Sequence, residues 1–338
     1  MILVTGGTGL LGSHLLYELS GTGKMIRATR RPASDTALVR KIFSYYTSDP
    51  NSLLKNIEWV EADLMDYPAI EDALEGVTEI YHAGAVVSFF PKDYPQMRKV
   101  NINGTANLVN LAMEKGITKF CHVSSVATLG RAENNGIADE ETHWQPSRKN
   151  SCYSQTKYAG EREVWRAMEE GLPAVIVNPS VILGPGFWND NSGLFRLVWE
   201  GLKYYTTGIN GYVDVRDVVQ AMIRLMDQEF FGQRFIVSSE NLSYRDLFER
   251  IAKHLGKPAP TVHVTSLLSG IAWRVEAVRS FIRKAPPEVT RDMAVTSCQC
   301  YSYSNEKIKK TLGFDFISAE DSIRETCRLF LQDVSAGS

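Results

Sequence analysis

Short apolar runs rich in Val and Ile recur through the first half of the chain, and more polar segments separate them. Runs of this kind are typical of parallel strands that are buried on both faces. They lie at residues 1–4, 24–29, 57–61, 79–82, 119–123 and 174–178.

Helical patterns fill the segments between these runs. A short one lies at 69–74, a longer one extends from about 94 to 114, and another follows Tyr153. The connection at 34–56 is longer than a minimal one, and we expect an extra helix at about 37–46. This alternation predicts an α/β fold in which a doubly wound parallel sheet carries helices on both faces.

The pattern becomes less regular after Pro179, where helices mix with short strands and loop signals occur at 184–186 and 189–193. We therefore expect a first lobe at 1–178 and a smaller α/β lobe at 179–338, with strands free to cross back between them. The basic, amphipathic stretch at 265–284 predicts a helix that caps the second lobe. A membrane-facing helix is the less favoured alternative, because serines interrupt its apolar face.

Composition excludes several classes of protein. The 338 residues are 44% hydrophobic and 22% charged, with a net charge of −2 and no long run of one sign. Neither nucleic acid nor an anionic membrane is therefore an expected partner. No apolar stretch approaches the length of a membrane span, and the apolar N-terminal residues read as a strand and not as a signal peptide. Five scattered cysteines predict reduced thiols in a cytoplasmic protein, with no metal site.

A glycine-rich turn follows the first strand and leads directly into a helix. Gly6 would permit the tight turn, Gly9 would let backbone N–H groups approach phosphates, and Gly12 would let the helix pack on the strand. The helix N-terminus would face the negative charge. The turn predicts a dinucleotide-binding Rossmann domain whose cofactor contacts include Gly6, Thr8, Gly9, Leu10, Leu11 and Gly12.

Tyr153 and Lys157 are four residues apart on a predicted helix, so both side chains lie on one face. A free tyrosine has a pKa of about 10, and a neighbouring ammonium group is expected to lower it. The pair would then donate and accept a proton near neutral pH. Ser125 follows the strand at 119–123, at the sheet edge where ligands bind, and its hydroxyl could hold a substrate oxygen against Tyr153.

Together these motifs resemble the extended branch of the short-chain dehydrogenase/reductase superfamily, the NAD-dependent epimerase/dehydratase family, over nearly the whole chain. The matching motifs are TGxxGxxG at 5–12, Asp63-Leu64, HxAA-like residues at 82–85, NxxGT at 101–105, SSxA at 124–127, YxxxK at 153–157 and the loop at 179–185.

The resemblance implies that Tyr153 is the acid/base, that Lys157 orients the ribose and tunes Tyr153, and that Ser125 polarises the substrate oxygen. It implies that Ser124 contacts the cofactor region through its backbone. Further implied cofactor contacts are Asp63, Leu64, Ala83, Gly84, Ala85, Ser124, Tyr153, Lys157, Pro179 and Val181. It also suggests a homodimer through helices at 94–114 and 153–170.

The end of the second strand bears on the choice of cofactor. Enzymes that prefer NAD usually carry a carboxylate there, which binds the ribose 2′-hydroxyl, whereas this chain has Arg30 and Arg31. Guanidinium groups pair well with a 2′-phosphate, so we favour NADP and keep NAD open. Lys41, on the insertion, is a further candidate cation.

Three departures separate this chain from relatives that act on nucleotide-linked sugars. Val126-Ala127 stands where sugar dehydratases place an Asp-Glu pair, the segment at 208–211 lacks the basic residue of a diphosphate clamp, and Arg30-Arg31 disfavours NAD. The chain most resembles dihydroflavonol-reductase-like enzymes. We therefore predict an NADP(H)-dependent oxidoreductase that interconverts a small-molecule carbonyl and its alcohol. The alternatives are a nucleotide-sugar epimerase and a non-catalytic NADP-sensing regulator.

The second lobe is the expected substrate-binding lobe, and the expected substrate pocket is apolar and aromatic, although some of its side chains could instead pack between the lobes. Its leading candidates are Val87, Phe89 and Phe187, together with Ser125, and further candidates are Phe90, Trp188, Phe195 and Trp199. The acidic segment at 139–141 is expected to be a solvated loop.

Overall fold

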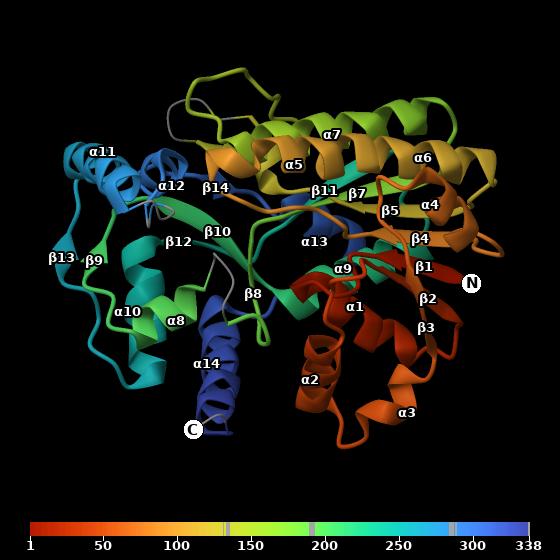
Figure 1. The fold of residues 1–338 in the computed structure, drawn as a ribbon, viewed down its shortest axis with the longest axis horizontal. Helices are drawn as coiled ribbons and strands as arrows, with labels where there is room; N and C mark the ends of the chain where they lie inside the picture. The colour runs from red at the N-terminus through yellow and green to blue at the C-terminus, as the bar shows by residue number, and fades with distance from the viewer. Residues whose placement is uncertain (131, 133–135, 189–192, 284–286, 288, 337–338) are drawn as a thin grey trace.

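The protein is described here by a computed structural model that covers residues 1–130, 132, 136–188, 193–283, 287 and 289–336. Seven parallel strands form its central sheet in the order β11-β7-β5-β4-β1-β2-β3 (Figure 1). They are β1 (Ile2–Thr5), β2 (Ile26–Arg30), β3 (Ile57–Glu61), β4 (Glu79–His82), β5 (Lys119–Val123), β7 (Ala174–Pro179) and β11 (Gln233–Val237). The predicted doubly wound α/β sheet is confirmed, and the chain reverses its direction of winding between β1 and β4.

Alternating side chains of these strands enter two separate cores, one on each face of the sheet. In β1, Ile2 and Val4 join one core and Leu3 joins the other. This alternation follows from the pleat of a strand. Helices α1 (Leu10–Ser20) and α9 (Val215–Asp227) contribute to the first core. The second core contains residues of α4 (Tyr67–Ala73), α6 (Thr105–Glu114) and α7 (Cys152–Glu169).

The predicted extra helix occurs as α2 (Ala37–Tyr46), and the sequence analysis missed the short α3 (Pro50–Leu54) that follows it. The long predicted helix at 94–114 is interrupted. It consists of α5 (Tyr94–Arg98), a π-helical segment η2 (Lys99–Gly104) and α6.

The second lobe is built around a three-stranded sheet in the order β12-β10-β8. Its core packs this sheet against α8, α10 and α14. These elements are β8 (Val181–Leu183), α8 (Leu194–Trp199), β10 (Ile209–Asp214), β12 (Glu240–Ser243), α10 (Tyr244–Leu255) and α14 (Ala319–Ala336). Because α9, β11 and α13 (Glu306–Leu312) pack with the seven-stranded sheet, the first lobe includes residues well beyond position 178.

Smaller elements complete the second lobe. Strands β9 (Tyr204–Tyr205) and β13 (Val262–His263) form one parallel pair, and β6 (Ile137–Ala138) and β14 (Ser302–Tyr303) form another. The predicted helix at 265–284 is α11 (Ser266–Arg283), packed with α12 (Arg291–Thr296) at the end of the molecule farthest from β3 (Figure 1). Lys284 and residues 189–192 of the predicted loop lie outside the described residues. Short 3₁₀ turns occur at η1 (Pro91–Asp93) and η3 (Val126–Thr128).

No helix in the described ranges combines the length and the apolar character that a membrane crossing requires.

One buried carboxyl group sits where α9 meets the C-terminal part of the chain. Asp217 is 5% exposed, and its Oδ2 accepts a hydrogen bond from the N–H of Ile317 at 2.9 Å. Burial raises the pKa of Asp217 to about 7, and the nearby charge of Asp214 acts in the same direction. Because the folded-state pKa is raised, the protonated form stabilises the fold. The contribution of Asp217 to the free energy of unfolding is complete below a pH of about 4 and is lost as the pH rises through about 7.

We predict that Asp217→Asn removes this pH dependence while keeping an oxygen that can accept from Ile317. Between pH 5 and pH 8, the melting temperature of the unmodified protein should fall relative to that of the variant. Differential scanning calorimetry measures both. Asp227→Asn, at the exposed end of the same helix, is the control and should track the unmodified protein. Parallel pH curves for all three proteins would contradict the assignment.

Candidate active site

The glycine turn after β1 has the conformation that the sequence predicts. Gly6 has φ of +73°, and a Cβ atom there would lie 2.7 Å from the carbonyl group of Ala83. A Cβ atom on Gly12 would lie 2.1 Å from the Gly6 carbonyl oxygen. Only glycine fits either position. The turn therefore brings the end of β1, the N-terminus of α1 and the segment after β4 into contact, leaving a backbone cradle at the point where the winding reverses.

A cavity of about 1920 Å³ opens from this cradle and extends into the second lobe. The predicted cofactor contacts and the leading substrate-pocket candidates all line it: Gly6, Thr8, Gly9, Leu10, Leu11, Gly12, Arg30, Arg31, Asp63, Leu64, Ala83, Gly84, Ala85, Val87, Phe89, Ser124, Ser125, Tyr153, Lys157, Pro179, Val181 and Phe187. Trp188 and Phe195 line it as well, but Phe90 and Trp199 do not. Trp199 instead packs on Phe330, with ring centroids 5.8 Å apart.

Lys157 points inward from α7 and is 4% exposed. Its Nζ donates a hydrogen bond to the carbonyl oxygen of Val123, at the end of β5, at 2.8 Å. Burial lowers the pKa of Lys157 to about 8, and the charge of Glu161 partly offsets this effect. The side chain therefore spans the space between α7 and the end of β5.

Tyr153 lies one turn earlier on the same face of α7. Burial raises its pKa, while a hydrogen bond with the side chain of Ser125 acts in the opposite direction. The expected net lowering of the Tyr153 pKa below its usual value is therefore wrong for this arrangement. The reason is that removal of the phenol from water has the largest effect on its pKa. The hydrogen bond with Ser125 offsets this effect only in part.

Ser125 begins the turn η3, and its hydroxyl oxygen accepts a hydrogen bond from the N–H of Ala127 at 3.1 Å. Its carbonyl oxygen accepts from Asn178 Nδ2 at 3.1 Å. These contacts hold both the hydroxyl and the carbonyl group of Ser125 in place beside Tyr153. The ring of Phe89 lies 6.1 Å from that of Tyr153, so the phenol has an apolar neighbour on another side.

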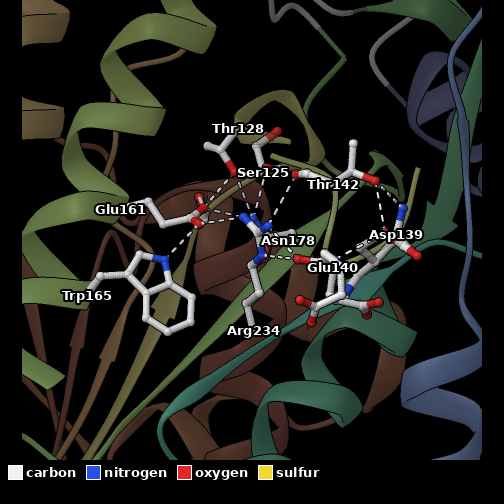
Figure 2. Close-up of polar contacts among 12 residues, drawn as sticks. Ser125, Thr128, Asp139, Glu140, Thr142, Glu161, Trp165, Asn178 and Arg234 are labelled. Atoms are coloured by element: carbon white, nitrogen blue, oxygen red, sulfur yellow. Dashed lines mark hydrogen bonds and ion pairs between the residues drawn. The ribbon is translucent and has the colours of Figure 1, made fainter. Parts of the chain in front are cut away.

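A buried carboxylate that the sequence analysis did not single out connects these elements (Figure 2). Glu161, one turn beyond Lys157 on α7, is 2% exposed. Its Oε2 accepts hydrogen bonds from Ser124 Oγ at 2.5 Å, Thr128 Oγ1 at 2.6 Å and Asn178 Nδ2 at 2.9 Å. Its Oε1 accepts from Trp165 Nε1 at 3.1 Å and from Arg234 at 3.3 Å. The sequence offered one indication of this buried carboxylate: Glu161 lies four residues after Lys157, which places both side chains on the same buried face of the helix.

The network continues to the segment that was expected to be a solvated acidic loop. Glu140 is 7% exposed, and its Oε1 accepts from the N–H of Ile236 at 2.8 Å. Arg234 Nε donates to the Glu140 carbonyl oxygen at 2.8 Å (Figure 2). The expectation is therefore wrong for Glu140, because β11 returns to the sheet and supplies donors that local sequence does not reveal.

Ser124 has less freedom to contact a cofactor than the resemblance implies. Its N–H donates to the Val177 carbonyl oxygen at 2.8 Å, and its hydroxyl donates to Glu161. Both of its hydrogen-bond donors are therefore engaged within the protein. Asn101 plays a comparable bracing role in the NxxGT motif, since its amide accepts from the N–H of Val86 and donates to Thr156 on α7.

The cations near the end of β2 differ in their availability. Arg30 pairs with Glu61 at 2.8 Å, although its buried Nε has no hydrogen-bond partner within the described ranges. Lys41 is already engaged by Asp333 at 2.7 Å. Arg31 is exposed at the cavity wall, where the described residues offer it no ion pair. The glycine cradle, the orphaned Nε and the unpaired Arg31 together fit the phosphates of a nicotinamide dinucleotide.

No cluster of three metal-ligating side chains occurs among the described residues.

Comparisons with known proteins give matches over most of the chain. Residues 2–237 match the family model described as NAD dependent epimerase/dehydratase family. The chain is 31% identical to sterol demethylase protein B of Methylococcus capsulatus over 84% of each chain. It is 29% identical to a Synechocystis sp. protein assigned as a dihydroflavonol 4-reductase, over 97% of this chain and 93% of that one. The crystal structure of gox2253, which is 29% identical, superposes with a TM-score of 0.80 over 98% of both chains.

We predict that Glu161→Gln destabilises the protein by about 3 kcal/mol, because the new NH₂ group cannot accept from the donors that converge on the carboxylate and Arg234 loses the carboxylate with which it pairs. Urea denaturation measures the change. Glu163→Gln, which removes a half-buried pair with Arg166 on the same helix, is the matched control and should cost less than about 1 kcal/mol. Equal stabilities for the two variants would show that the network does not brace α7.

Proposed function

The chain belongs to the NAD dependent epimerase/dehydratase family, and we propose that it is an NADP(H)-dependent oxidoreductase that interconverts a ketone or aldehyde and its alcohol. Members of this family are enzymes that depend on a nicotinamide dinucleotide. The observation that carries the proposal is the placement of Tyr153, Ser125 and the buried Lys157 on one wall of the cavity that also contains the glycine cradle.

The chain's own residues supply a complete path for the proton. When bound, a nicotinamide dinucleotide supplies or accepts hydride. The Ser125 oxygen accepts from Ala127 and its hydroxyl bonds the Tyr153 side chain, so in the proposed reaction the hydroxyl hydrogen would turn from Tyr153 toward a substrate oxygen. Tyr153, whose pKa is raised by burial, is protonated at neutral pH and can give its proton to the same oxygen. This arrangement favours carbonyl reduction.

Lys157 supports this chemistry electrostatically. With a pKa of about 8 it carries a positive charge at neutral pH, where it stabilises the negative charge left on Tyr153 after proton transfer. Its bond to the Val123 carbonyl holds the ammonium group at the sheet edge. The residues that would hold the cofactor are the glycine turn, Asp63 and the segment after β4.

The names of relatives support a hydrophobic carbonyl substrate. The name of the Methylococcus protein refers to a sterol, and that of the Synechocystis protein refers to a dihydroflavonol. Sterols and dihydroflavonols are both polycyclic compounds. The apolar residues Val87, Phe89 and Phe187 on the cavity wall agree with such a substrate.

We predict that Tyr153→Phe lowers kcat about 10²-fold or more while the affinity for NADPH is retained, because only the proton donor is removed. The assay follows NADPH consumption with hydrophobic ketones and aldehydes, and a fluorescence titration follows NADPH binding. Tyr158→Phe is the control, since Tyr158 lies on the same helix, stacks on Trp144 and does not line the cavity.

Two other results would replace the proposal. Interconversion of nucleotide-linked sugars without net NADPH consumption would identify an epimerase. Full biological function of the Tyr153→Phe protein would identify an NADP-sensing regulator, which needs no proton donor.

A second prediction concerns the choice between NADP and NAD. Arg31→Ala should raise the Kd of NADPH roughly tenfold or more and leave that of NADH nearly unchanged, because a guanidinium group binds a 2′-phosphate through charge-assisted hydrogen bonds. Titration of the full chain measures both constants. Arg40→Ala removes a nearby arginine that bonds Asn51 outside the cavity, and it should change neither. Tighter binding of NADH than NADPH to the unmodified protein would assign NAD instead.

A further inference from the structure

Helix α11 presents an apolar strip to the same cavity that contains Tyr153. Leu268, Ile271 and Val275 are three and four residues apart, so they project from one face of the helix. All three line the cavity, and yet they are 53%, 50% and 59% exposed. About half of each side chain is thus left in contact with solvent inside the cavity, and a contiguous group of exposed apolar side chains marks a binding surface. We call these three residues the α11 strip.

A second apolar wall comes from the short pair of strands β9 and β13. Tyr204 and Val262 are paired partners in this ribbon, and they are 59% and 47% exposed. Both line the same cavity as the α11 strip. The cavity therefore extends beyond Ser125 and Tyr153 into a region whose walls offer hydrocarbon surface from two separate elements.

The polar groups of this region are largely engaged within the protein. Arg279 lies 3.9 Å from Glu276 on its own helix, and Arg196 lies 3.8 Å from Glu200 on α8. Ser269, on α11, donates to the carbonyl oxygen of Ala294 at 3.1 Å. A ligand in this region would therefore gain chiefly from removing apolar surface from water.

We propose that the α11 strip holds the hydrocarbon body of an extended carbonyl substrate, whose carbonyl group lies at Tyr153 and Ser125. The position of the carbonyl rests on the proposed function, whereas the apolar site rests on the exposure and continuity of the strip. The substrate class is a lipid-like ketone or aldehyde with a long or polycyclic hydrocarbon body. The continuity of the strip with the catalytic wall in one cavity favours this occupant over a membrane surface or a second copy of the chain.

The test uses the full chain, NADPH and a homologous series of unbranched methyl ketones. Because each buried methylene contributes about 0.8 kcal/mol, kcat/KM should rise by up to roughly fourfold per methylene. In the double variant Ile271→Ser/Val275→Ser this increase should flatten, so that the loss of kcat/KM relative to the unmodified protein grows with the length of the ketone.

Leu267→Ser is the matched control. Leu267 lies on the same helix and is 75% exposed, but it does not line the cavity. Since all of these side chains are largely exposed, serine there should leave the fold intact, and the melting temperature verifies this. An equal effect of the control and the double variant would overturn the proposal.

A binding experiment separates this proposal from the proposed function. Calorimetric titration with unbranched alcohols of increasing length needs no turnover. If affinity grows with length in the unmodified chain and not in the double variant, the strip binds hydrocarbon even where no ketone is reduced. If the length dependence is the same in both proteins, the strip does not hold the substrate. Loss of phosphatidylcholine vesicle binding or of a dimer in the double variant, with unchanged length dependence, would identify an interface instead.

Discussion

The arrangement of the active site depends on one buried carboxylate. Glu161 accepts hydrogen bonds from Ser124, which directly follows β5, and from η3, β7 and β11, although its own backbone belongs to α7. Five donors converge on two oxygen atoms in a place that water does not reach, and a charge can remain there only because each lone pair is used. The result is that the helix carrying Tyr153 and Lys157 cannot shift without breaking bonds to the strand ends that carry Ser125 (Figure 2).

The cavity has two regions with different physical character. At the sheet edge, Lys157, Ser125 and Asn101 are each held by backbone or amide contacts, which suits groups that must meet a reacting atom in one geometry. Toward α11 the walls are apolar and exposed, and they impose shape and hydrophobicity but few directional contacts. A rigid catalytic wall and a permissive apolar wall are compatible with one carbonyl chemistry acting on varied hydrocarbon bodies.

Burial also determines the protonation of the catalytic pair. It raises the pKa of Tyr153 and lowers that of Lys157, because each group loses water that would stabilise its charged form. The phenol is thus kept as an acid at neutral pH, and the ammonium remains charged partly because Glu161 lies one turn away. The same carboxylate therefore serves both the geometry and the electrostatics of the site.

Local sequence alone determined six of the seven strands of the central sheet, the glycine turn and the shared face of Tyr153 and Lys157, because these follow from period, backbone freedom and helical spacing. The sequence analysis missed β11, which returns to the edge of the sheet from beyond position 178. Tertiary structure alone decided the burial of Glu140, the capture of Lys41 by Asp333, the direction of the Tyr153 pKa shift and the exposure of the α11 strip. Each of these depends on partners far away in the chain, such as Arg234 for Glu140. The environment of a side chain is set by what the fold packs around it, and short-range patterns carry no record of those neighbours.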